Sequence, residues 1–297
     1  MSGSGTVVAV GQNVKTLKVG DEVYGHNVRK PMFRDPPSFW ASEYARVHAG
    51  NLLIKPPHIP WESAASLSGF VCTAYQTIRR GLQLAGYSSL EGKTVYIPAA
   101  LSGTGSVIIQ VARNVFGASK IISTVSTAKV PLVEQHLPGM VDQVIDYKTT
   151  KLLDVVPRGS VDFMVNTQFA TLSPAVPLLN PRTGVLVSVT SLPTKATVRE
   201  MLGADRMPFW LGPALDVLNL YYNWLLWGTN IKYEMVSGDP GKREDLEVAG
   251  EIIAREQVKG VVRVVPLEDL EGVRKGCNEV FTQVGGVGRM IVKVRKD

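Results

Sequence analysis

Residues 99–105, Ala-Ala-Leu-Ser-Gly-Thr-Gly, are small enough to let the backbone approach a phosphate group closely. They follow an apolar run at 94–97 and precede apolar residues at helical spacing, which predicts a loop between a strand and a helix. The helix N-terminus would offer free N–H groups and partial positive charge to a pyrophosphate. The strict G-x-G-x-x-G pattern is not met, because Ala99 and Ser102 replace glycines. The context favours a dinucleotide site at Ser102, Gly103, Thr104 and Gly105 over an ordinary tight turn.

The segment after the second expected strand, 120–125, carries hydroxyl groups and a cation instead of an acid. In NAD-binding proteins, a carboxylate about 20 residues beyond the loop binds the ribose 2′-hydroxyl. Here no acid occurs until Glu134, whereas Ser126 and Lys129 could donate hydrogen bonds to a 2′-phosphate. The sequence therefore predicts NADPH as the cofactor, with a solvated loop as the alternative. Tyr147 could pack beside the adenine ribose, or could be a partly buried tyrosine without a ligand.

Short apolar runs alternate with helical patterns through the middle of the chain. The expected strands are 94–97, 120–125, 142–145, 161–165 and 184–189. Continuous apolar strands that alternate with helices are typical of a parallel sheet covered on both faces. We therefore expect an α/β fold with a doubly wound, Rossmann-type parallel sheet.

The two ends of the chain have a different character. Before residue 60 the sequence predicts a small antiparallel unit, with a first strand at 6–10 and a turn at 20–25 leading into another. A helix is expected to begin near Ser63. Residues 261–294 are again rich in strand-forming residues, with a short helix at 270–277.

The segment 207–231 is rich in aromatic residues and has Asp216 as its one charged residue. It contains Trp210, Trp224 and Trp227. Three interpretations stay open: a buried or oligomer-facing helix, an aromatic lid over an apolar substrate, and shallow membrane contact through 209–227.

Composition restricts the function classes. With 297 residues, 45% hydrophobic and 20% charged, the chain is typical of a globular protein and not of a disordered one. The net charge of +6 comes from scattered Lys and Arg, which favours a small anionic ligand over nucleic acid. No apolar run is long enough to span a membrane. We expect the cytoplasm, because the first residues lack the pattern of a signal peptide.

Metal chemistry is not expected. The two cysteines are isolated and the four histidines show no ligand spacing, whereas zinc sites need closely placed Cys or His. Without a Lewis acid, the oxidation of a simple alcohol is difficult. A conjugated acceptor needs less help, because hydride addition at its β-carbon spreads charge onto the carbonyl oxygen, where hydrogen-bond donors can stabilise it.

Several motifs together resemble the medium-chain dehydrogenase/reductase superfamily, in its zinc-independent quinone oxidoreductase and enoyl reductase branch, which includes zeta-crystallin-like proteins. The motifs are residues 5–11 (GTVVAVG), 19–25 (VGDEVYG), 73–76 (TAYQ), 102–106 (SGTGS) with Gln110, and 144–147 (VIDY). The resemblance implies a Rossmann domain at 67–257, inserted into a GroES-like catalytic domain formed by 1–66 and 258–297. It also implies that the N-terminal part of the catalytic domain is shortened, and that a homodimer forms.

The resemblance assigns further residues by position. Asn166 matches a position near the nicotinamide ribose, Thr190 lies in the loop that passes the nicotinamide, and Arg289 stands near the cofactor. No catalytic residue is assigned. The resemblance implies an NADPH-dependent enzyme that transfers hydride to a quinone or an α,β-unsaturated carbonyl compound, with a small apolar or conjugated substrate. The alternatives are an enoyl-thioester reductase acting on acyl-CoA or an acyl carrier, and an NADPH-binding protein with impaired catalysis.

Overall fold

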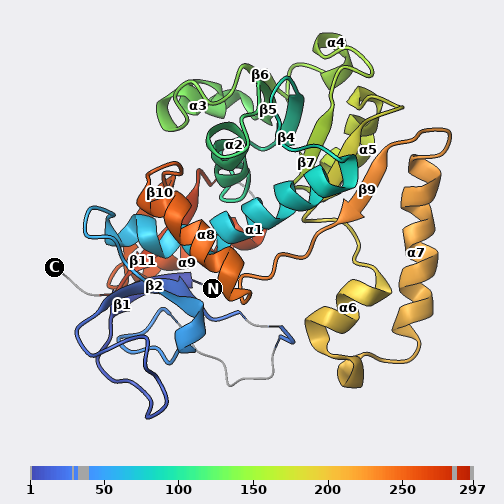
Figure 1. The fold of residues 1–297 in the computed structure, drawn as a ribbon. Coiled ribbons are helices and arrows are strands. Elements are labelled where there is room, and N and C mark those ends of the chain that lie inside the picture. Colours follow the sequence, from blue (N-terminus) through green and yellow to red (C-terminus); the bar gives the residue numbers. More distant parts are fainter. Residues whose placement is uncertain (1, 29, 33–39, 283–285, 295–297) are drawn as a thin grey trace.

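The computed structural model describes residues 2–28, 30–32, 40–282 and 286–294. Its centre is a six-stranded sheet in the order β6-β5-β4-β7-β8-β9, in which every pair is parallel (Figure 1). The strands are β4 (Thr94–Pro98), β5 (Lys120–Val125), β6 (Gln143–Asp146), β7 (Phe163–Asn166), β8 (Val185–Ser188) and β9 (Lys232–Met235). The chain runs outward from β4 to one edge and then from β7 to the other, as in a doubly wound sheet. The predicted fold class is confirmed.

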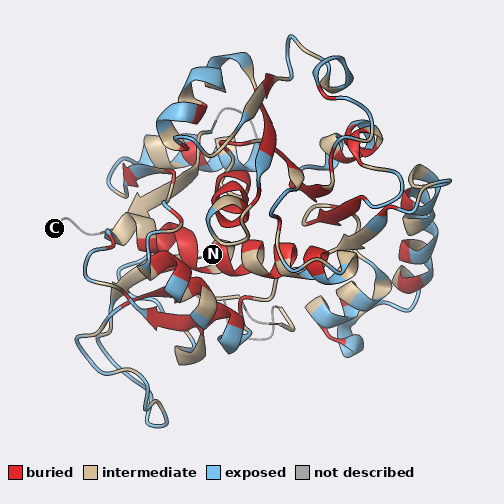
Figure 2. Ribbon diagram, turned by 45° about the horizontal axis from the view of Figure 1, so that its top comes forward, coloured by how far each residue is buried: buried red, intermediate tan, exposed pale blue. Residues whose placement is uncertain are grey.

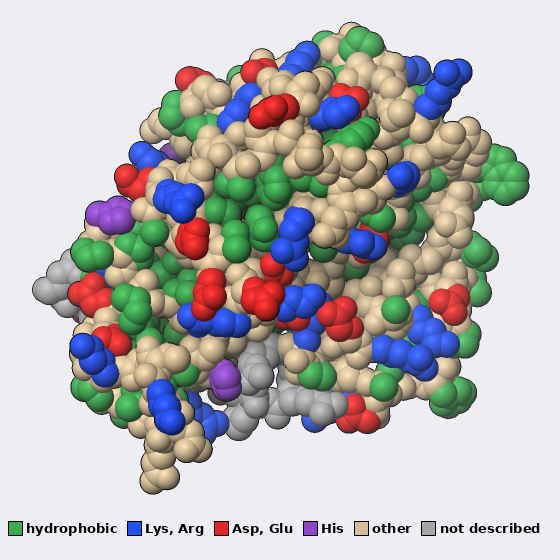
Figure 3. Space-filling view, viewed as in Figure 1, with side chains coloured by type: hydrophobic (Ala, Val, Ile, Leu, Met, Phe, Trp, Pro, Cys, Tyr) green, Lys and Arg blue, Asp and Glu red, His purple; other side chains and the backbone are tan. Residues whose placement is uncertain are grey.

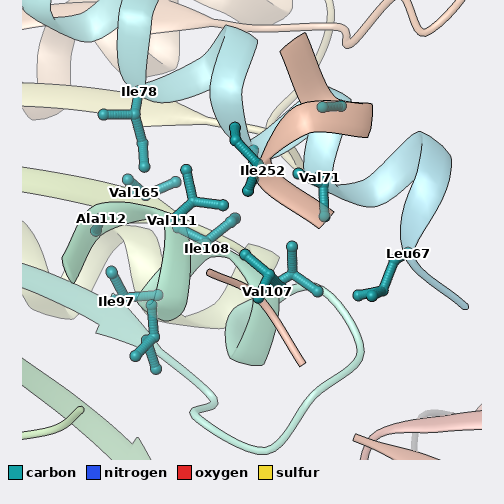
Figure 4. Packing of buried hydrophobic residues seen from close by; sticks show 14 of the residues in the cluster. Leu67, Val71, Ile78, Ile97, Val107, Ile108, Val111, Ala112, Val165 and Ile252 are labelled. Carbon is teal, nitrogen blue, oxygen red and sulfur yellow. The ribbon is translucent and has the colours of Figure 1, made fainter. Parts of the chain in front are cut away.

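Helices cover both faces of this sheet, because alternate strand residues point to opposite sides. Ile97, Val165 and Val187 pack in one buried cluster with α1 (Trp61–Ala85), α2 (Gly105–Asn114) and α8 (Arg243–Ala254), as Figure 4 shows for part of it. Tyr96, Met164 and Leu186 belong to a second cluster with α5 (Phe169–Ala175) and α7 (Leu211–Leu225). Buried residues accordingly concentrate in the sheet and in α1 (Figure 2). The shorter α3 (Val130–His136) and α4 (Leu152–Val155) follow β5 and β6.

The long helix α1 joins the two parts of the molecule. It begins two residues before Ser63 and ends at Ala85, where Gly86 takes a left-handed conformation with φ of 74°. Leu67, Val71 and Ile78 lie on its buried face, as their helical spacing predicts. The N-terminal half of this helix supports the small sheets, and the C-terminal half lies under the large one (Figure 1).

Two small sheets come from the ends of the chain and lie near one another (Figure 1). One is antiparallel, in the order β1 (Ser2–Thr6), β2 (Glu22–His26) and β3 (Leu52–Ile54). The other pairs β10 (Val262–Pro266) with β11 (Arg289–Lys293), and α9 (Leu270–Thr282) lies between them in sequence. The expected strand at 6–10 is wrong, because pairing ends at Thr6 and the side chains of Val8 and Val10 are exposed.

Helices α6 (Lys195–Leu202) and α7 stand at the edge of the molecule beyond β9 (Figure 1). Figure 3 shows hydrophobic side chains along the edge formed by α7, where Trp227 is 84% exposed. Of the interpretations of 207–231, a helix buried within this chain is wrong, since of the α7 residues only Gly212, Leu215 and Tyr222 are buried, whereas an oligomer-facing helix stays a prediction. No helix among the described residues is long and apolar enough to cross a membrane.

Candidate dinucleotide site

The loop after β4 folds tightly against the start of α2. Ala99 has a positive φ of 59°, and the Ser102 hydroxyl accepts a hydrogen bond of 2.8 Å from the Gly105 N–H. A Cβ atom on Gly105 would lie 2.3 Å from the Ala99 carbonyl oxygen, so only glycine fits there. Ser102 forms a parallel bridge with Gly288, and the Thr104 N–H donates to no acceptor among the described residues. The loop therefore has the narrow, donor-lined form that suits a pyrophosphate.

This loop lies at the point where the strand order reverses. β4 has β5 on one side and β7 on the other, and ligands of doubly wound sheets bind at the carboxyl ends of strands beside this point. The Thr167 hydroxyl donates a 3.0 Å hydrogen bond to the Pro98 carbonyl, which joins the ends of β7 and β4. The predicted loop thus occupies the place where a dinucleotide would cross the sheet.

The C-terminal segment contacts the same loop. The Gly288 N–H donates to the Leu101 carbonyl at 2.8 Å, and a Cβ on Gly103 would lie 2.7 Å from Cγ of Arg289. The Arg289 guanidinium lies 3.5 Å from the Phe70 ring centroid and donates to the Ser66 carbonyl at 2.8 Å. Burial lowers the pKa of Arg289 to about 10, so it still carries its charge at neutral pH. No carboxylate among the described residues pairs with it, which leaves this charge available to a phosphate.

The residues predicted for the adenosine end gather at the carboxyl ends of β5 and β6. The Tyr147 N–H donates to the Val125 carbonyl at 3.1 Å, so the two loops lie side by side. Lys129 Nζ donates to the Gly286 carbonyl at 2.6 Å, and burial lowers the pKa of this lysine. The Tyr147 ring is 55% exposed, so it could stack on a flat ligand. Ser126 lies between Val125 and the short turn that carries Lys129.

Sequence reasoning missed an acid at this end. Asp146 pairs in register with Val125, directly before Ser126. The Thr127 hydroxyl is the main cause that lowers the pKa of the Asp146 carboxyl, by hydrogen bonding to it. In the sequence, the next acid after β5 is Glu134. In the structure, the parallel register of β6 places Asp146 beside the end of β5. The sequence signal that could have predicted Asp146 is the strand–helix alternation, because neighbouring parallel strands end at the same edge of the sheet.

Asn166 and Thr190 meet at the ends of β7 and β8. Asn166 is fully buried, and its amide donates to the Ser188 hydroxyl at 3.0 Å and to the Thr190 hydroxyl at 3.4 Å. Its carbonyl oxygen accepts from the Thr171 hydroxyl at 2.8 Å. Since the amide is held from both sides, it fixes the position of Thr190.

Comparisons with known proteins agree with this arrangement. Over 159 residues, the chain is 38% identical to a 2-methylene-furan-3-one reductase of Solanum lycopersicum, covering 53% of this chain and 38% of that protein. It is 37% identical over 161 residues to a chloroplastic NADPH-dependent alkenal/one oxidoreductase of Arabidopsis thaliana, covering 54% of this chain and 39% of that protein. The chain spans about two fifths of the length of these relatives. No family model matches it.

The solved structures extend the likeness over the whole fold. The quinone oxidoreductase of Coxiella burnetii superposes with a TM-score of 0.68 at 20% identity, covering 98% of this chain and 78% of that one. At 20% identity this likeness shows a shared fold, and membership of the medium-chain dehydrogenase/reductase superfamily stays a prediction from the sequence motifs.

Metal ligands are a separate question. Among the residues that the structure describes, no three His, Cys, Asp or Glu side chains cluster as a metal site would require. Cys72 is buried and Cys277 is exposed, and neither forms a disulfide.

Proposed function

We propose that this protein is an NADPH-dependent oxidoreductase that reduces a quinone or an α,β-unsaturated carbonyl compound without zinc. The observation that carries the proposal is the loop 99–105, closed by Gly105 and flanked by the unpaired cation Arg289, at the reversal point of the sheet. The names of the two relatives, an alkenal/one oxidoreductase and a furanone reductase, support an activated alkene as substrate.

The residues fit NADPH along its whole length. In the proposed assignment, residues 102–105 and Arg289 hold the pyrophosphate, Ser126 and Lys129 hold the 2′-phosphate, and Tyr147 packs on the adenosine. Asn166 and Thr190 lie at the nicotinamide end. When bound, the cofactor supplies a hydride to the acceptor.

The chain's own residues would orient the acceptor and stabilise its oxygen. The Thr190 hydroxyl accepts a hydrogen bond from Asn166, so its own proton is free to donate to a carbonyl oxygen. Such a donor stabilises the negative charge that develops on this oxygen when the β-carbon is reduced. Asn166 acts here as a positioning residue, because its own donors and acceptor are engaged.

We further propose the division of the chain into a Rossmann domain at 67–257 and a GroES-like domain at 1–66 and 258–297. This division is supported by the separate small sheets formed from the two ends of the chain. A homodimer is proposed as well, since β9 is an edge strand of the six-stranded sheet and offers its free side for pairing.

The test is the oxidation of NADPH, followed at 340 nm, with a panel of quinones and enones. We expect turnover with at least one acceptor and a preference for the free enone over the matching CoA thioester. Faster reduction of the thioester would favour the enoyl-thioester alternative. Tight NADPH binding without turnover of any acceptor would favour the NADPH-binding protein with impaired catalysis.

A further inference from the structure

A cavity of about 280 Å³ opens at the carboxyl ends of β7 and β8, on the face of the sheet covered by α5 and α7. Asn166, Thr190 and Ser191 supply its polar side. Phe169, Leu172 and Tyr221 supply apolar walls from α5 and α7. The cavity thus joins the proposed nicotinamide end of the site to the aromatic segment that the sequence singled out.

The wall formed by α7 is fixed to the loop after β8. The Leu192 N–H donates to the Tyr222 hydroxyl at 2.9 Å, and the Asn219 amide donates to the Pro193 carbonyl at 3.1 Å. The Tyr233 hydroxyl donates to the Ser191 hydroxyl at 2.6 Å. Because these contacts join α7 and β9 to the loop that carries Thr190, the cavity is a preformed part of the fold.

The polar groups of the cavity are few and mostly engaged. Asn166 uses both sides of its amide, and Ser191 already accepts from Tyr233. The Thr190 hydroxyl keeps a proton that it can donate. A ligand that matches this lining has one carbonyl oxygen at its inner end and an apolar body.

The mouth of the cavity lies at exposed aromatic side chains. Phe169 is 66% exposed and Tyr221 is 46% exposed, although both line the cavity. Tyr221 also lies 6.3 Å from Trp224 between ring centroids, so the wall continues onto the hydrophobic edge seen in Figure 3. An apolar compound can therefore reach the cavity along this surface.

We propose that this cavity binds the apolar body of the acceptor and that Tyr221 and Ser173 determine its size. A cavity of 150 Å³ holds benzene, so about 280 Å³ scales to a body of roughly ten carbon atoms. The substrate class is then a monocyclic enone or quinone with an alkyl or alicyclic body, held with its carbonyl oxygen at Thr190. This inference rests on the proposed function, and it adds the size and shape of the acceptor.

The test compares two enones that share the reacting group and differ in their body. Carvone has ten carbons in a monocyclic frame, and 3-buten-2-one has four. Ser173 is exposed and lines the cavity, so Ser173→Trp fills it without entering the core. Tyr221→Ala removes one wall. Phe281→Ala is the matched control, because Phe281 is an exposed aromatic side chain on α9.

We expect either cavity variant to raise the KM for carvone about tenfold or more, because an apolar pocket discriminates between substrates on this scale. The KM for 3-buten-2-one should change less than twofold. The NADPH Kd and the control variant should keep wild-type values. Equal effects on the two enones, no effect on carvone, or a weakened NADPH Kd would overturn the inference. If Ser173→Trp does not fold by circular dichroism, Tyr221→Ala decides.

Equilibrium binding separates this inference from the proposed function. Carvone binding is followed by quenching of tryptophan fluorescence, which needs no turnover. If the protein reduces no enone but binds carvone, and the cavity variants lose this binding, the inference about the cavity would stand and the proposed function would be contradicted. If the protein reduces carvone and both variants leave this turnover unchanged, the proposed function would be supported and the role of the cavity contradicted.

Discussion

Gly105 lies against the Ala99 carbonyl so closely that a Cβ atom would stand 2.3 Å from its oxygen. The same glycine donates its N–H to the Ser102 hydroxyl at 2.8 Å. Together these contacts hold the loop between β4 and α2 in the form that leaves the Thr104 N–H without an acceptor among the described residues. The geometry of this one residue is therefore central to the proposed cofactor site.

Gly105→Val should weaken the binding of NADPH and of NADH alike, because the loop must move away from Ala99 to admit the side chain. We expect a loss of at least tenfold in both Kd values, measured by isothermal titration. Gly5→Val is the control, since a Cβ at Gly5 meets no atom within 4 Å. Wild-type affinity in Gly105→Val would mean that this loop does not hold the cofactor.

Lys129→Glu should weaken NADPH more than NADH, since only NADPH carries the 2′-phosphate. A hydrogen bond to a charged group contributes about 1.5–3 kcal/mol, so the NADPH Kd should rise about 10- to 100-fold. Lys120→Glu is the matched control, because Lys120 begins the same strand β5 at its opposite end. If both cofactors respond equally to Lys129→Glu, the assignment of the 2′-phosphate site is wrong.

Asp146→Asn should strengthen NADPH binding relative to NADH. The change removes a negative charge next to Ser126 and keeps an acceptor for the Thr127 hydroxyl. We expect a gain of a few-fold for NADPH and for 2′,5′-ADP, measured by competition, with little change for NADH. Asp142→Asn, directly before β6, serves as the comparison. Weaker binding of 2′,5′-ADP by Asp146→Asn would show that the carboxylate helps to form the pocket.

Acid should destabilise the protein through His26. Burial lowers the pKa of His26 from 6.5 to about 4. Below pH 6.5 the unfolded chain takes up a proton that the folded chain does not, so stability is complete above this pH and falls as the pH falls towards 4. The shift corresponds to about 3 kcal/mol.

Urea unfolding between pH 8 and 4.5 measures this effect. His26→Leu should flatten the loss of stability on the acid side, whereas His58→Gln, a change at an exposed histidine, should leave it as in the wild type. An equally steep loss in His26→Leu would assign the acid sensitivity to other groups.

The sequence patterns that are local in the chain predicted the fold well. The strand at Lys120–Val125 was expected with its observed bounds, because its run of β-branched residues is buried on both faces. β9 was not expected, since Lys232 and Glu234 break its apolar character at the sheet edge. The expected strand at 6–10 failed because strand pairing, and not the run of valines, decides where β1 ends.

In the candidate site too, residues that are adjacent in sequence could be predicted, whereas residues that only the fold brings together could not. The loop 99–105 could be found from its small residues, which lie next to one another in sequence. Asp146 could not be found in this way, because only the register of β6 against β5 brings it beside Ser126. The cavity between α5 and α7 likewise depends on the contact of Tyr222 with the loop after β8, which no spacing in the sequence indicates.

The transfer of an isotope tests the central claim most directly. NADPH in which both hydrogens at C4 of the nicotinamide are replaced by deuterium is incubated with the protein and carvone, and the product is examined by mass spectrometry and NMR. The account predicts one deuterium atom at the β-carbon of the reduced enone. A reduced product without deuterium, or no reduced product from any enone or quinone in the panel, would contradict it.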